Sequence, residues 1–183
     1  VGTETAPALW SGHQLVNNDF STVDSFTNTL DGAVVATIFV RDGDDFVRIT
    51  TSLKKEDGLR SIGTKLDRQH PAYATLMKGE PFWGPALLFG RDYITHYHPL
   101  LDEKKQVIGA VFIGLDFTQS LADLKKRIES VKVGDTGYAF AINARPGDKY
   151  GVAIIHPTQQ NKSLLEVKDG RGFPLVQAML ERK

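Results

Sequence analysis

The feature that most constrains the fold is a run of three apolar, β-branched segments in the middle of the chain. They cover about Pro81–Phe89, Asp92–Leu101 and Val107–Phe117, and only short turns at Gly90-Arg91 and Asp102–Lys105 separate them. Turns this short join neighbouring strands that run antiparallel, because a parallel connection needs a dozen or more residues. The run therefore predicts three antiparallel strands of one sheet.

A hairpin precedes this run. The segments Ala33–Arg41 and Phe46–Leu53 are rich in β-branched and aromatic residues, and an Asp-Gly turn at Asp42–Asp45 separates them. Two such segments around an Asp-Gly turn are typical of a β-hairpin. Because side chains alternate along a strand, we expect Arg48 and Thr50 to share one face of the second strand.

Two helices are predicted near the strands. Pro71–Lys78 begins with proline and is followed by Gly79, and these residues favour the start and the end of a helix. Ser120–Val131 has apolar residues at helical spacing. Strands and helices together predict an α+β fold, in which a five-stranded antiparallel sheet carries helices on one face, a PAS-like architecture.

The order of the elements divides the chain into four segments. Residues 1–32 form a lead-in with a short strand at Val16–Phe20 and a short helix at Ser21–Leu30. Residues 33–119 form a complete module, and residues 120–133 form a connecting helix. Residues 134–183 repeat the strand, turn, strand, loop and helix of the module and end before its last three strands. We interpret this tail as a partial second module, and chance recurrence of a common pattern is the alternative.

Composition argues against several functions. Lys and Arg total 22 and Asp and Glu total 22, so no net charge attracts nucleic acid or an anionic membrane. The longest apolar stretch, Val107–Leu115, has about half of the roughly 20 residues that a membrane helix needs, so any membrane helices lie outside this chain. Cysteine is absent, and so are the motifs of serine hydrolases, phosphate-binding loops and zinc proteases. We therefore expect no enzyme activity, no cofactor and no nucleic-acid partner.

Several strings resemble the Cache sensor superfamily. They are Asp45–Ile49, Ile62–Leu66, Lys78–Pro85, Asp92–Asp102 and Val107–Asp116. Together they look like the single-Cache module of a methyl-accepting chemotaxis receptor, in the group in which two Cache-type modules are fused. The tail strings Gly134–Phe140 and Ile155–Pro157 are similar to the start of a second such module.

This resemblance implies a periplasmic or extracellular domain of a bacterial inner-membrane receptor. Such a domain lies between two membrane helices, binds a small organic ligand and signals its occupancy inward. The sensor domain of a histidine kinase or of a cyclic-dinucleotide enzyme is an alternative. A dimerisation module without a ligand is another, and a homodimer is compatible with each of them.

The resemblance also implies a pocket between one face of the sheet and the loop and helix that cover it, with small carboxylates as common ligands. An anion in such a pocket needs a cation and directed hydrogen-bond donors. We predict Arg48 as the anchor and Lys65 as a second cation, with hydroxyl groups as donors and aromatic rings as walls. The predicted site residues are Arg48, Thr50, Lys65, Trp83, Tyr93, Thr95 and Tyr97.

Two histidines suggest a different site. His96 and His98 are two residues apart on one strand and are expected to lie on the face opposite Tyr97. Neutral imidazoles at this spacing can bind a metal ion and would suit a metalloenzyme. A third ligand is not evident, since only His70 and His156 could be added, and we therefore predict no metal site.

Overall fold

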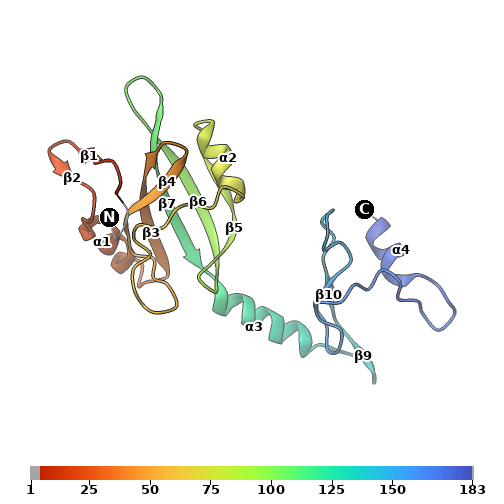
Figure 1. Ribbon diagram of the computed structural model, residues 1–183. Coiled ribbons are helices and arrows are strands. Elements are labelled where there is room, and N and C mark those ends of the chain that lie inside the picture. The colour runs from red at the N-terminus through yellow and green to blue at the C-terminus, as the bar shows by residue number, and fades with distance from the viewer. Residues whose placement is uncertain (1–4, 183) are drawn as a thin grey trace. The chain divides into compact units, whose positions relative to one another are not determined.

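The computed structural model describes residues 5–182. The chain divides into two compact units, Val1–Thr118 and Gln119–Lys183 (Figure 1). The first unit contains the large sheet and the predicted site residues. The second contains short strands and a terminal helix.

The first unit is built on a five-stranded antiparallel sheet, as predicted. Its strands stand in the order β4-β3-β7-β6-β5, so the first hairpin joins the later meander through β3 and β7. The most apolar segment, β7, lies at the centre of the sheet with a partner on each side. The strands are β3 (Val34–Asp42), β4 (Asp45–Thr51), β5 (Phe82–Leu88), β6 (Arg91–Leu101) and β7 (Val107–Asp116).

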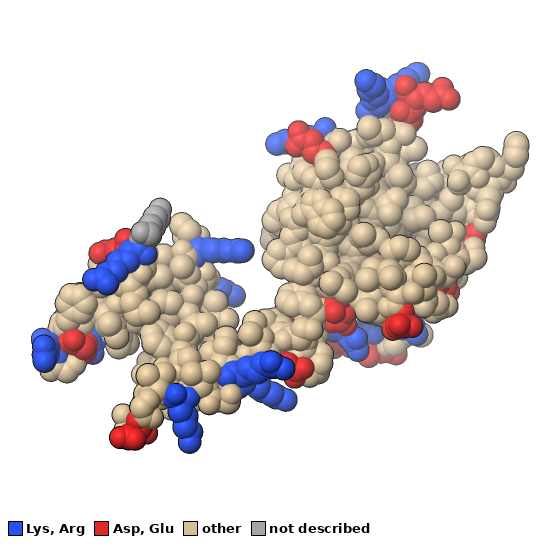
Figure 2. Space-filling view, turned by 180° about the vertical axis from the view of Figure 1, so that it is seen from behind, with Lys and Arg blue, Asp and Glu red and all other residues tan. Residues whose placement is uncertain are grey.

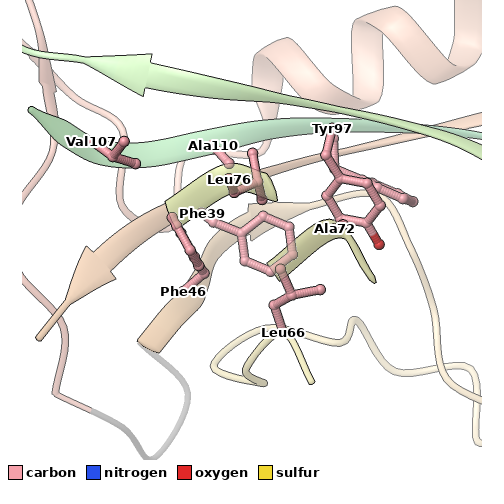
Figure 3. Close-up of a cluster of buried hydrophobic side chains, with 9 residues drawn as sticks. Phe39, Phe46, Leu66, Ala72, Leu76, Tyr97, Val107 and Ala110 are labelled. Carbon is pink, nitrogen blue, oxygen red and sulfur yellow. The ribbon is translucent and has the colours of Figure 1, made fainter. Parts of the chain in front are cut away.

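One face of the sheet is covered by the helix α2 (Pro71–Met77) and by the loop at residues 52–70. The loop adds itself to the free edge of β4, where the Leu66 amide donates to the Phe46 carbonyl at 2.9 Å. Helix and sheet enclose the main core (Figure 3). Its buried members are Phe39, Phe46, Leu66, Ala72, Leu76, Tyr97, Val107, Ala110 and Phe112.

The opposite face is covered over β3 and β4. There lie the helix α1 (Ser21–Thr29) and a small hairpin of β1 (Trp10–Ser11) and β2 (Gln14–Leu15) (Figure 1). The sheet thus has a helix on each face, whereas the sequence predicted helices on one face. The predicted strand at Val16–Phe20 is wrong, because this segment forms turns that lead into α1.

The outer face of β5 and β6 keeps apolar side chains at the surface. Trp83, Leu87 and Ile94 are exposed there. Figure 2 shows a broad part of the first unit's surface without charged groups, and positive and negative side chains lie beside each other at its margins. In this view, the first unit shows no large surface area that is only positive or only negative.

The second unit has a small core of its own. It contains most of α3 (Thr118–Glu129), then β8 (Lys132–Val133), β9 (Gly137–Tyr138), β10 (Ala141–Ile142), β11 (Ala153–Ile155) and α4 (Leu175–Glu181). Ala153, Leu164 and Val176 are its buried cluster. The predicted hairpin and helix of the tail are present, with shorter strands than expected.

Among residues 5–182, none of the helices is both long enough and apolar enough to span a membrane.

Candidate functional site

Arg48 is a buried cation in the middle of β4. It is only 4 % exposed, since it faces the main core and the loop covers it. Its Nη1 donates to Thr64 Oγ1 at 2.5 Å, and the guanidinium carbon lies 4.8 Å from the ring centre of Phe39 and 5.9 Å from that of Phe89. Burial lowers the pKa of Arg48 to about 10, so the side chain still carries its charge at neutral pH.

Tyr97 faces the same core from β6. Its ring packs against Phe112 at 4.8 Å and Phe39 at 6.4 Å between ring centres, and the residue is fully buried. Burial raises its pKa to about 12, an effect that the nearby Arg48 charge partly offsets. The Tyr97 hydroxyl is therefore a neutral donor at physiological pH. In Figure 3 this oxygen projects from the edge of the apolar cluster.

Two polar atoms in this core have no partner. Among the described residues, Arg48 Nε and Tyr97 Oη are the buried side-chain nitrogen and oxygen atoms without a hydrogen bond. A buried donor without an acceptor destabilises the fold by about 1–3 kcal/mol, and more when it is charged. Such groups are few in native proteins, and a bound ligand, an ion or an ordered water commonly supplies the missing partner. Both atoms lie under the same cover of loop and helix.

Small residues beside this face make room for the aromatic rings. Gly84, Thr95 and Gly114 are register partners on three neighbouring strands. A β-carbon on Gly114 would lie 2.8 Å from Phe112 Cζ, closer than real contacts allow, and 3.2 Å from Tyr93 Cδ1, which is a tight contact. The absence of a side chain at Gly114 leaves room for the rings of Phe112 and Tyr93 over β7.

A cavity of about 660 Å³ opens at the end of the sheet, where β4 ends and the turn between β5 and β6 lies. Val35, Phe89 and Tyr93 supply its apolar wall. Its rim is polar, with Lys54 and Glu56 among its residues. Because Phe89 also contacts the Arg48 guanidinium, the cavity adjoins the buried cation.

Tyr93 and Thr95 lie on the same face as Tyr97, as alternation predicts. Tyr93 is buried in the cavity wall, and burial raises its pKa. Thr95 Oγ1 donates to the Gly84 carbonyl at 2.7 Å. Its hydroxyl hydrogen is therefore engaged within the sheet, and only its oxygen could accept a further bond.

Thr50 lies on the other face, contrary to the prediction. A β-bulge between Ile38 and Phe39 shifts the register, so that Arg48 pairs with Phe39 while Thr50 pairs with Ile38. The bulge puts one extra residue into β4, so the side chains beyond it point to the face opposite the one that simple alternation predicts. Thr50 Oγ1 consequently donates to the Asp19 carbonyl at 2.6 Å, on the side of the N-terminal segment.

Trp83 and Lys65 are also separate from the buried pair. Trp83 pairs with His96 across the strands, so its ring points to the outer face, is 67 % exposed and stacks on His96 at 3.8 Å. The prediction of Trp83 as a wall beside Tyr97 is thus wrong. Lys65 Nζ lies at the surface and forms an ion pair with Asp45 at 2.9 Å.

The histidines do not assemble into a cluster of three. His96 and His98 share the outer face, with 6.0 Å between ring centres. Within residues 5–182, no group of three or more His, Cys, Asp or Glu side chains is placed to hold a metal ion. His70 instead accepts from the Ala72 amide through Nδ1 at 3.1 Å, and so caps α2.

Three residues of the site escaped prediction. Phe39 faces Arg48 across the hairpin, Thr64 accepts from Arg48, and Phe89 both lines the cavity and lies beside the Arg48 guanidinium. A phenylalanine directly before the glycine of a tight turn was the available signal for Phe89. Nothing in the sequence indicated Thr64, because its contact depends on the path of an irregular loop.

An α+β domain with this five-stranded antiparallel sheet and a covering helix has a PAS-like architecture. The chain belongs to the Cache 3/Cache 2 fusion domain family, whose model matches residues 1–183. Cache domains are sensor modules that bind small molecules and typically have no enzymatic activity.

Several solved structures are similar to the chain. The extracellular domain of the histidine kinase mmHK1S-Z2 is 14% identical with a TM-score of 0.45, over 87% of this chain and 64% of that chain. The periplasmic sensory domain of the Campylobacter jejuni chemoreceptor Tlp1 is 16% identical with a TM-score of 0.39, over 87% and 62%. A structure named Methyl-accepting Chemotaxis protein X is 16% identical with a TM-score of 0.39, over 87% and 64%. The chain spans less than two thirds of each. A search of curated protein sequences gives no match.

Proposed function

We propose that the first unit binds a small organic carboxylate between Arg48 and Tyr97 and releases it unchanged. The observation that carries the proposal is the pair of buried donors, Arg48 Nε and Tyr97 Oη, that have no acceptor. A carboxylate supplies acceptor oxygens and one negative charge, which satisfies both donors and compensates the buried cation. The aromatic surroundings suit a ligand whose remaining part is small and apolar.

Burial strengthens the proposed interaction. A charge-assisted hydrogen bond is worth more in a dry interior than in water, because no solvent competes for the donor. Arg48 is buried and still cationic, and the Tyr97 phenol stays protonated, so both atoms carry a hydrogen to donate at neutral pH. In this proposal Tyr93 lines the path to the site, and Thr95, whose hydroxyl hydrogen is donated to the Gly84 carbonyl, makes no hydrogen bond to the carboxylate.

We further propose that this domain is the periplasmic or extracellular part of a transmembrane chemotaxis receptor. The support is the set of strings that resemble chemotaxis receptors, together with the sensor family. The test uses the full-length receptor in its native cells. Addition of the bound acid should change their swimming bias, and deletion of the receptor should abolish that response. A change in phosphotransfer to a response regulator without any change in swimming would instead favour a histidine kinase.

Thermal unfolding with a panel of small organic acids tests the binding site. A ligand at about 100 times its Kd adds about 2.7 kcal/mol to the free energy of unfolding, which raises the Tm by about 5–10 °C. We expect at least one short carboxylic acid to do this for the wild type. Arg48→Gln should lose the shift, since the amide cannot supply the charge.

The matched control is Arg68→Gln. Arg68 is a surface arginine whose side chain is 56% exposed and paired with Asp45, so this variant should keep the full shift. An acid that stabilises the wild type and Arg48→Gln equally would contradict the proposed site.

A further inference from the structure

The turn between β5 and β6 holds an unusual residue. Phe89 has φ +49° and Gly90 has φ +77°, and the flanking Leu88 and Arg91 are register partners. A two-residue hairpin turn with positive φ at both positions normally has Asn, Asp or Gly at the first of them. A phenylalanine there is strained by its β-carbon, and such strain is retained where function requires the side chain.

The strained backbone places the Phe89 ring against both the cavity and the buried cation. The ring lines the 660 Å³ cavity and is only partly buried. Its centre lies 5.9 Å from the guanidinium carbon of Arg48, whose other ring neighbour is Phe39 at 4.8 Å. Phe89 is thus the aromatic contact of Arg48 on the side of the cavity.

The turn is also in contact with the rim of the cavity. A β-carbon on Gly90 would lie 2.8 Å from Glu56 Oε1, so the loop after β4 rests directly on the turn. Lys54, Lys55 and Glu56 of this loop line the same cavity. The Phe89 ring therefore lies beside the polar rim of the cavity.

We propose that Phe89 is a gate that separates the outer cavity from Arg48 and Tyr97, and that its ring limits the size of the carboxylate that is admitted. This inference rests on the proposed function, because it assigns the ligand's path to the same site. A ligand passes when the ring turns away, and the ring then closes over it. Removal of the ring leaves a space of phenyl size next to the guanidinium.

Two variants test the gate without a natural ligand. Phe89→Gly removes the ring and suits the positive φ, so it should fold at least as well as the wild type. Phe89→Leu keeps an apolar side chain at the same strained backbone position. The first readout is the exchange rate of the Arg48 Nε hydrogen with water, measured by NMR. We expect it to rise at least tenfold in Phe89→Gly and to change less than threefold in Phe89→Leu.

The second readout uses sodium acetate and sodium benzoate as probes in thermal unfolding. Benzoate should stabilise Phe89→Gly and not the wild type, because its ring occupies the space of the Phe89 ring while its carboxylate meets Arg48. An unchanged Arg48 Nε exchange rate in Phe89→Gly would overturn the gate, even if acetate binds. Faster exchange without stabilisation by either probe would support the gate and count against the proposed carboxylate site.

Discussion

At the scale of single residues, the site is a compromise between stability and binding. Arg48 and Tyr97 each keep a buried donor without a partner, which costs free energy in the unliganded protein. A ligand that completes both hydrogen bonds recovers it, so these two residues should affect stability and affinity in opposite directions.

Tyr97→Phe tests this compromise. Loss of the unpartnered hydroxyl should leave the free energy of unfolding unchanged or raise it by up to about 1 kcal/mol, because no hydrogen bond is lost. The same change should weaken carboxylate binding about tenfold, or about 1.4 kcal/mol. Denaturant unfolding and a binding titration measure the two effects.

Tyr73→Phe is the matched control for this change. The Tyr73 hydroxyl donates to the Asp44 carbonyl at 2.7 Å, so its loss should lower stability by about 0.5–1.5 kcal/mol and leave binding unchanged. A clear loss of stability in Tyr97→Phe would mean that its hydroxyl has a partner in the folded protein.

At the scale of elements, the sequence predicted each strand of the sheet within about two residues, because alternation and turn residues are local signals. The order of the strands was not predicted, since the pairing of β3 with β7 depends on contacts far apart in the sequence. The bulge beside Phe39 was also invisible to alternation, and it moved Thr50 to the other face. Trp83 was misplaced because its strand was predicted but its pairing with His96 was not.

The site could be predicted in part for the same reason. Arg48 was identified because a charge in the middle of an apolar strand requires compensation. Tyr97 followed from the composition of its strand face. Phe89 and Thr64 were missed, because a strained turn and an irregular loop place them beside Arg48.

The capping of α2 leads to a prediction of pH dependence. His70 Nδ1 must be unprotonated to accept from the Ala72 amide, and burial lowers the His70 pKa from its usual value near 6.5, with Asp67 opposing that effect. The unfolded chain therefore binds this proton more readily than the folded one. The stability that His70 contributes is complete above about pH 6.5 and is lost as the pH falls towards the lower folded pKa.

His70→Asn isolates this effect, because asparagine also caps helices and does not titrate. Thermal unfolding between pH 5 and 8 should show a smaller loss of stability at acid pH in His70→Asn than in the wild type. Parallel curves for the two proteins would show that His70 does not carry this part of the pH dependence.

At the scale of the whole molecule, every residue of the proposed site belongs to the first unit. The main core and the cavity also lie within residues 5–118. The second unit has its own buried cluster of Ala153, Leu164 and Val176, which is small. Binding should therefore depend on the first unit alone.

A protein of residues 1–118 tests this division. It should fold cooperatively and bind the selected acid with a Kd within about threefold of that of the whole chain, because no contact of the site is lost. Circular dichroism and a binding titration are the measurements. A folded fragment that no longer binds the acid would place part of the site in the second unit.

The central claim is that Arg48 and Tyr97 together hold a carboxylate, and a crystal structure of the complex with the selected acid tests it most directly. We expect carboxylate oxygens at hydrogen-bond distance, about 2.7–3.2 Å, from Arg48 Nε and within about 3 Å of Tyr97 Oη. An acid bound elsewhere, with both donors still unpartnered in the core, would contradict it.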